Sequence, residues 1–242
     1  MAIDHIDPTI DKHAQPVAVR LGRGVAIVLG ISISTGISAW AVGTAIASVA
    51  GNRNQMWLLG RAAGITSYAL LLSLVASGLV LSHPWRARWR RPSPATRIRV
   101  HVSVAAFTLV FATLHIVVLV QDKYAGVGLR GALLPMAATY RPMAVTLGVI
   151  GIYSGLLAGL TALLAGRIAA RIWWPIHKVA ILALVLVWLH GVLAGSDSPA
   201  LRWMYYSSSF FILAMAVSRY TARTPADLVA ELTSESHKNV RR

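Results

Sequence analysis

Four histidines lie in two long apolar stretches of the sequence, residues 97–120 and residues 175–195. They are His101, His115, His177 and His190, so the two imidazoles are 14 residues apart in the first stretch and 13 in the second. Ionisable side chains inside a membrane are costly and usually functional, and a neutral imidazole binds a metal through a ring nitrogen. The spacing therefore indicates a metal or cofactor site, and packing or interfacial histidines are the alternative interpretation.

The composition is that of an integral membrane protein. Of 242 residues, 56% are hydrophobic and 13% are charged, whereas a soluble domain has about 25% charged residues. Six separate apolar runs predict a helical bundle, because the strands of a membrane barrel alternate over about ten residues. Cysteine is absent, which excludes disulfides, thiolate metal sites, iron–sulfur clusters and covalently attached haem. Histidine is therefore the main candidate metal ligand.

We therefore predict an all-α fold, a polytopic membrane bundle of six transmembrane helices. The apolar runs that predict these helices cover approximately residues 21–50, 55–82, 98–120, 143–165, 175–195 and 203–219. Residues 1–20 are expected to form a cytoplasmic N-terminal arm, residues 21–219 the six-helix transmembrane domain that holds the four histidines and any cofactor they bind, and residues 220–242 a cytoplasmic C-terminal tail.

The basic residues predict the orientation of the bundle. The net charge is +15, and the 23 Lys and Arg residues lie mainly in the connections. With six spans, 17 of them fall on the side of the two termini and 6 on the opposite side. The positive-inside rule then places both termini in the cytoplasm. Basic connections beside apolar helices indicate anionic lipid as a partner rather than nucleic acid. We expect a multi-pass protein of the cytoplasmic membrane.

The two histidine-bearing helices are two apart in the chain, so they run in the same direction. His101 and His177 then lie near the cytoplasmic face, and His115 and His190 lie deeper, after rises of about 21 Å and 19.5 Å. This predicts the pairs His101–His177 and His115–His190, each holding one b-type haem. A haem with two imidazole ligands has no open position for O₂ chemistry, so the expected function is electron transfer.

One geometric point does not fit an ideal helix. At 100° for each residue, 14 residues return to within about 40° of the same face, whereas 13 residues leave about 140° between His177 and His190. Helix tilt, a distorted first turn after Pro175, or sideways offset of the two haems are the three explanations that the sequence leaves open.

The paired histidine spacing resembles that of the ferric reductase-like transmembrane domain family. The family includes the membrane part of NADPH oxidases and eukaryotic ferric reductases, and the haem subunit of the bacterial methionine sulfoxide reductase system. Further similarities are the Leu-Gly-Arg of residues 59–61, the Leu-Gly-Val-Ile of residues 147–150, Trp174 before His177, and the Trp-Leu-His-Gly of residues 188–191. The resemblance covers roughly residues 55–195. It implies two haem b groups that pass electrons from a cytoplasmic donor to an acceptor outside.

The resemblance also suggests which cations lie near the haems. Arg61, on the outer side, is a candidate partner for a propionate of the outer haem, with snorkelling to the lipid headgroups as the alternative. Arg99 and Lys178 are candidates for the inner haem, or ordinary positive-inside residues. Arg130, Tyr124 and Arg141, in the long loop of residues 121–142, are candidates for guiding an anionic acceptor, with an ordinary loop at the level of the lipid headgroups as the alternative.

Larger members of this family continue into a flavin- and nicotinamide-binding domain, and no glycine-rich nucleotide loop or βαβ pattern is recognisable in this sequence. The chain is therefore expected to be the haem-binding membrane subunit of an oxidoreductase. Its electrons are expected to come from a separate flavoprotein or from quinol, and to pass to a protein, a ferric chelate or oxygen.

Two other functions are compatible with the sequence. One is a single-haem, quinol-linked cytochrome b subunit, in which one histidine pair is structural. The other, from a different class, is a small membrane transporter that uses the histidines for protons or metal. Transporters of that kind usually carry acidic residues inside the membrane and inverted repeats. None of the six predicted helices contains Asp or Glu.

Overall fold

Helices make up the described part of the chain, in which no β-strand occurs. The computed structural model describes residues 54–88, 92–167, 169–196 and 198–223, and in addition residues 44, 47, 48, 50–52, 229 and 230. The chain divides into two compact units, Met1–Arg53 and Asn54–Arg242, and every helix discussed below belongs to the second unit. The arm of residues 1–20, and nearly all of the predicted helix 21–50 and of the tail beyond residue 223, lie outside the described residues.

Four helical spans in the described residues are long and apolar enough to cross a membrane. They are α2 (Gln55–Ser82), α3 (Pro94–Gln121), α5 (Pro142–Leu163) and the span Ala170–Ala194, which consists of α6 (Ala170–His177) and α7 (Val179–Ala194). The prediction of a helical membrane protein is confirmed to this extent. The predicted helix 203–219 lies within α8 (Ser198–Thr221), which is not among the four. The count of six spans and the orientation stay predictions.

The helix that carries His101 and His115 begins earlier than the hydrophobic pattern suggests. α3 starts at Pro94, four residues before the predicted start, because Ser93 caps it: its Oγ accepts a hydrogen bond from the Thr96 amide at 3.2 Å. Proline is favoured at the first position of a helix, where its missing N–H costs nothing. Arg97 then lies in the first turn, and its guanidinium donates to the Pro92 and Arg86 carbonyls at 3.1 and 3.2 Å.

The long connection between α3 and α5 is not entirely a loop. It contains the short helix α4 (Gly128–Leu133), and both Gly126, before the helix, and Gly128, its first residue, have positive φ. The connection between α2 and α3 contains the 3₁₀ turn η1 (Pro84–Arg88). The sequence contains the turn residues for both, but elements of five and six residues are too short to show a hydrophobic period.

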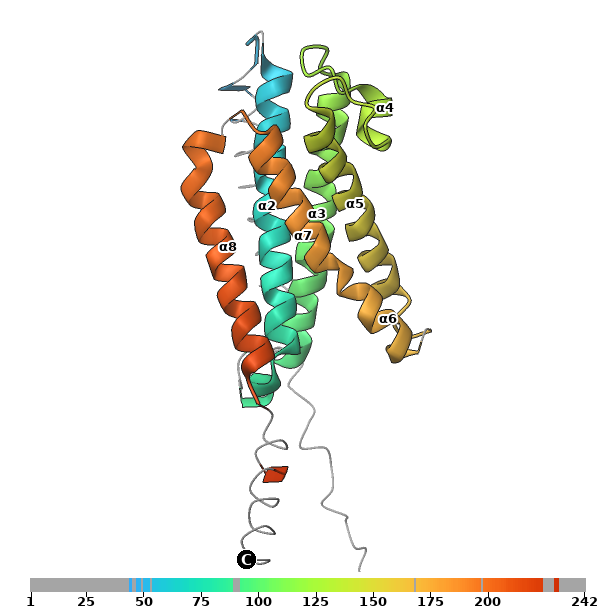
Figure 1. The fold of residues 1–242 in the computed structure, drawn as a ribbon, viewed down its shortest axis with the longest axis vertical. Helices are drawn as coiled ribbons and strands as arrows, with labels where there is room; N and C mark the ends of the chain where they lie inside the picture. Colours follow the sequence, from blue (N-terminus) through green and yellow to red (C-terminus); the bar gives the residue numbers. More distant parts are fainter. Residues whose placement is uncertain are drawn as a thin grey trace, which may run out of the picture. The chain divides into compact units, whose positions relative to one another are not determined.

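The bundle is built from two closely packed helix pairs. α2 packs along α3, and α5 packs along α7, while α2 also contacts α7 and α8 (Figure 1). The buried core lies where α2 meets α7 and α8, and it consists of Tyr68, Leu71, Val75, Leu79, Leu184 and Tyr205. Within the described residues, α3 and α7 make no extended contact with each other. The two histidine-bearing helices are therefore each held by a partner helix.

Much of the apolar surface of α3 faces outward. Val118 is the buried residue of this helix, whereas Phe107, Val110 and Leu114 are 58%, 60% and 46% exposed. A helix that is apolar on nearly all sides is typical of a membrane span. Burial of a large apolar side chain contributes about 1.5–3 kcal/mol, so lipid covers this surface far more favourably than water does.

We therefore expect the protein to remain with the membrane fraction after washing with alkaline carbonate, and to enter solution only with detergent. Alkaline washing removes proteins held by charge, whereas helices that cross the hydrocarbon core stay because their apolar side chains and paired backbone are stable there. Immunoblotting of pellet and supernatant measures this. Release of the protein by carbonate alone would contradict the assignment of four membrane spans.

Candidate haem-ligand site

The structure brings the four histidines together as the two predicted pairs. The ring centroids of His101 and His177 are 6.3 Å apart, with 66° between the ring planes. The ring centroids of His115 and His190 are also 6.3 Å apart, with 78° between the planes. Each pair joins one ring from α3 with one from the span Ala170–Ala194. The same separation therefore recurs at both levels of the bundle.

Three of the four imidazoles are oriented by backbone carbonyls of the partner helices. Nδ1 of His115 lies 2.6 Å from the Gly60 carbonyl oxygen, Nδ1 of His190 lies 2.8 Å from that of Ala144, and Nδ1 of His177 lies 3.0 Å from that of Ala158. A carbonyl oxygen only accepts, so Nδ1 must donate its hydrogen in each case. In a neutral ring, Nε2 then keeps its lone pair, which is the form that binds a metal.

Ser77 orients the fourth imidazole in the same way. Its hydroxyl donates to the Leu74 carbonyl at 2.8 Å, and its oxygen lies 2.8 Å from Nδ1 of His101. Because the hydroxyl hydrogen is used by Leu74, the oxygen accepts from Nδ1 of His101. All four rings therefore have the same tautomer, assigned from their partners. Within the described residues, none of the four Nε2 atoms has a hydrogen-bond partner.

Glycines make room for the two deeper imidazoles. A Cβ atom on Gly64 of α2 would lie 2.8 Å from the His115 ring, and a Cβ on Gly148 of α5 would lie 2.9 Å from Nδ1 of His190. In both helices the glycine follows the carbonyl acceptor by four residues. The carbonyl of residue i in a helix points toward residue i+4, so a glycine there leaves its oxygen open to a neighbouring side chain. Gly60 with Gly64 and Ala144 with Gly148 therefore hold His115 and His190 in the same way.

A break in the helix separates His177 from His190. The helical span is interrupted at Lys178, whose amide lies 3.2 Å from the Pro175 carbonyl and 3.4 Å from the Trp174 carbonyl. The Ile181 amide bonds the Lys178 carbonyl at 3.0 Å. The bonds from Lys178 to Pro175 and from Ile181 to Lys178 join residues three apart, as in a 3₁₀ turn, which winds more tightly than an α-helix. Proline in a helix also removes a backbone donor. A distorted turn after Pro175, one of the three explanations that the sequence leaves open, is present in the structure.

The three candidate cations lie close along the chain to the site histidines or to a carbonyl that orients one of them. Arg61 follows Gly60, the carbonyl acceptor of His115, and its guanidinium carbon lies 5.9 Å from the centre of the Trp57 ring. Arg99 is exposed on α3, two residues before His101. Lys178 follows His177, and its Nζ lies 5.8 Å from the centre of the Trp174 ring. Each is close along the chain to a site histidine or its acceptor.

The loop residues suggested for acceptor binding have different surroundings. The Arg141 guanidinium donates to the Leu193 carbonyl at 2.6 Å, and the neighbouring Tyr140 hydroxyl donates to the Ala194 carbonyl at 2.9 Å. They satisfy carbonyls at the end of α7, which have no partner within that helix. Arg141 therefore holds the loop to α7, whereas Tyr124 and Arg130 are exposed.

The described residues contain no group of three His, Cys, Asp or Glu side chains that is arranged to hold a metal ion. Each histidine pair supplies two ligands, so any metal it binds must obtain its remaining ligands from a non-protein group. Several supporting residues are not apparent from the sequence, namely Ser77 and the carbonyls of Gly60, Ala144 and Ala158. The sequence feature that could have indicated these supporting residues is the presence of small residues within an apolar helix.

Comparison of the chain with protein-family models, with curated proteins and with solved structures gives no match.

Proposed function

We propose that the chain is a di-haem b membrane protein that transfers electrons across the membrane. The observation that carries the proposal is the double pair: two imidazoles at each level, with ring centroids 6.3 Å apart at both. An imidazole nitrogen binds a metal at about 2 Å, and two such rings on opposite sides of one ion have centroids roughly 6 Å apart. Both pairs fit this separation, and the angles of 66° and 78° between the ring planes are compatible with it.

The ligand chemistry also fits haem. Iron in a haem already has four nitrogen ligands, so it needs two further ligands from the protein, and each pair supplies two. The haem, when bound, supplies a one-electron ferric–ferrous couple. The chain supplies the orientation: Nδ1 is held by a carbonyl or by Ser77, and Nε2 is left with a lone pair. Metal-binding histidines almost always donate their other N–H in this way.

We propose that electrons move from the cytoplasmic pair, His101 and His177, to the outer pair, His115 and His190. The bias of basic residues, 17 against 6 in a six-span arrangement with both termini in the cytoplasm, supports the assignment of His101 and His177 to the cytoplasmic side. The resemblance to the ferric reductase-like transmembrane domain family supports the direction of electron flow. The proposed partners are a separate flavoprotein or quinol as donor, and a protein, a ferric chelate or oxygen as acceptor, in a cytoplasmic membrane.

Three cations are proposed to pair with haem propionates. Arg61 is proposed for the outer haem, because it follows the residue whose carbonyl holds His115. Arg99 and Lys178 are proposed for the inner haem, because Arg99 lies two residues before His101 and Lys178 directly follows His177. Arginine suits a carboxylate particularly well, since its planar guanidinium donates two parallel hydrogen bonds.

A haem count tests the proposal. The protein is purified in detergent from cells that are supplied with a haem precursor, and its haem is measured as the pyridine complex against protein mass. Two haems for each chain and a low-spin b-type spectrum are expected. One haem would favour the single-haem cytochrome, and no haem at all would refute the proposal and return the histidines to packing or transport roles.

Replacing Ser77 with alanine is expected to raise the reduction potential of the inner haem by a few tens of millivolts. The hydrogen bond to Nδ1 makes His101 a stronger donor to the iron and favours the ferric form. A hydrogen bond is worth about 1 kcal/mol, and about 59 mV corresponds to a tenfold change for one electron. Potentiometric titration followed by absorbance measures both haems. Ser73→Ala, on the same helix, is the control, because Ser73 bonds only the Ala69 carbonyl.

A further inference from the structure

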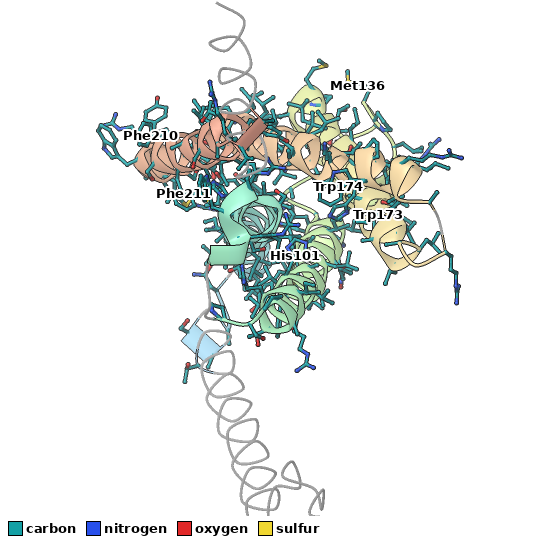
Figure 2. The ribbon with its side chains drawn as sticks, turned by 90° about the horizontal axis from the view of Figure 1, so that it is seen from below. His101, Met136, Trp173, Trp174, Phe210 and Phe211 are labelled. Carbon is teal, nitrogen blue, oxygen red and sulfur yellow. The ribbon has the colours of Figure 1, made fainter. Side chains whose placement is uncertain are left out.

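Two neighbouring indoles contact one of the four site histidines. The Trp174 ring is stacked on the His177 ring, with centroids 6.4 Å apart and 25° between the planes. The Trp173 ring lies 5.8 Å from His177 at 62°, and the two indoles lie 5.2 Å from each other. The three rings form one cluster, which we call the indole cluster. Figure 2 shows both tryptophans on α6, beside the part of the bundle that contains His101.

The indole cluster distinguishes His177 from the other site histidines. Within the described residues, the rings of His101, His115 and His190 have aromatic contacts only with their partner histidines. Trp174 is 39% exposed and Trp173 is half-buried. Aromatic rings therefore extend without interruption from the protein surface to the ligand at one level of the bundle. An indole that serves only to anchor a helix at the headgroups needs no contact with a ligand ring.

Basic residues flank the cluster in the chain. Arg171 and Arg167 are exposed nearby in the chain, and the Lys178 ammonium lies 5.8 Å from the centre of the Trp174 ring. Among the described residues, Asp122 is the only acidic side chain, and it caps the opposite end of α3 from the helix start near His101. A positive surface around an apolar aromatic patch attracts a partner that is acidic around its own redox group.

We propose that the indole cluster, with Arg171 beside it, is the docking surface at which an acidic soluble redox protein delivers electrons to the inner haem. This inference rests on the proposed function and specifies the donor as a protein rather than a quinol within the bilayer. In each encounter one electron would leave the partner, which is oxidised, and would be taken up by the haem that His101 and His177 would hold. No bond forms or breaks, and both indoles end unchanged. Their role is to bring the partner close and to fill the space in front of His177.

The test uses photoreduced flavodoxin, a small acidic protein, as the probe and the purified full chain in lipid nanodiscs. The double variant Trp173→Leu/Trp174→Leu is expected to keep two haems and to be reduced about tenfold more slowly, the scale of loss when a steered encounter is weakened. Arg171→Glu, which leaves the rings in place, is expected to show a similar loss. Trp203→Leu, at a 71% exposed indole on α8, is the matched control and is expected to behave as the unaltered protein.

A binding measurement separates docking from electron transfer. Oxidised flavodoxin is titrated onto the immobilised protein, and the affinity is expected to fall with added salt and to fall in Arg171→Glu. Unchanged reduction rates in both variants would overturn the proposal. It would also be overturned if decylubiquinol reduced the unaltered protein faster than flavodoxin does, at a rate that does not depend on salt. If the double variant loses haem, Arg171→Glu alone decides the outcome. Absence of haem from the unaltered protein is a separate result, which refutes the proposed function instead.

Discussion

The variant His115→Ala is expected to hold one haem for each chain instead of two. His115 and His190 face each other with ring centroids 6.3 Å apart, so removing either ring leaves its partner unable to hold the iron alone. The inner pair is on a separate level, about 21 Å away along an ideal helix, and is expected to keep its haem. The pyridine complex gives the count, and the loss removes the route to the outer face, so reduction of an external acceptor stops.

The pairing itself is tested by the double variant His115→Ala/His190→Ala. The effects of substitutions at one site are not additive, so the double variant is expected to keep the same single haem as each single variant. A further loss in the double variant would show that the two residues hold different haems. His83→Ala is the control, because its Nδ1 accepts from the Trp85 amide in the connection rather than lying within a pair. It is expected to keep both haems.

The sequence predicted the membrane helices well because their signal is local and strong. An apolar run of about 20 residues has few alternatives to a membrane span, and the predicted helix 55–82 has the bounds of α2. The early start of α3 at Pro94 depends on one side-chain bond from Ser93. The residues for that cap are visible in the sequence, but a prediction from hydrophobicity alone places the start of the helix where the apolar residues begin.

The pairing of the histidines was also predictable, from equal depth in two parallel helices. The orientation of the rings was not, because it depends on contacts between helices that are distant in sequence. The Gly60 carbonyl holds His115 across 55 residues of chain, and the Ala144 carbonyl holds His190 across 46. The turn at Lys178 is a third case, since an ideal helix gives about 140° between His177 and His190 and only the structure shows the 3₁₀ bonds there.

The variant Gly148→Ala is expected to lose the outer haem, even though alanine favours a helix more than glycine does. In a helix interior the substitution alone stabilises by about 0.5–1 kcal/mol. The added methyl would lie 2.9 Å from Nδ1 of His190 and 3.1 Å from its Cε1, which is well inside van der Waals contact. The ring must therefore move, and it cannot do so while keeping its 2.8 Å bond to the Ala144 carbonyl.

Gly155→Ala separates the steric effect from the gain in helix propensity. Gly155 lies on the same helix, and a Cβ there would meet only the Ala183 Cβ, at an ordinary 3.9 Å. Both variants gain the same propensity, so the difference in haem content between them measures the contact with His190. Gly64→Ala is expected to repeat the loss from the other side of the pair, since its Cβ would lie 2.8 Å from the His115 ring. If all three variants kept two haems with unchanged spectra, the glycines would be packing residues only. If Gly148→Ala and Gly64→Ala each lost one haem while Gly155→Ala kept both, two glycines on different helices would be shown to serve one ligand pair.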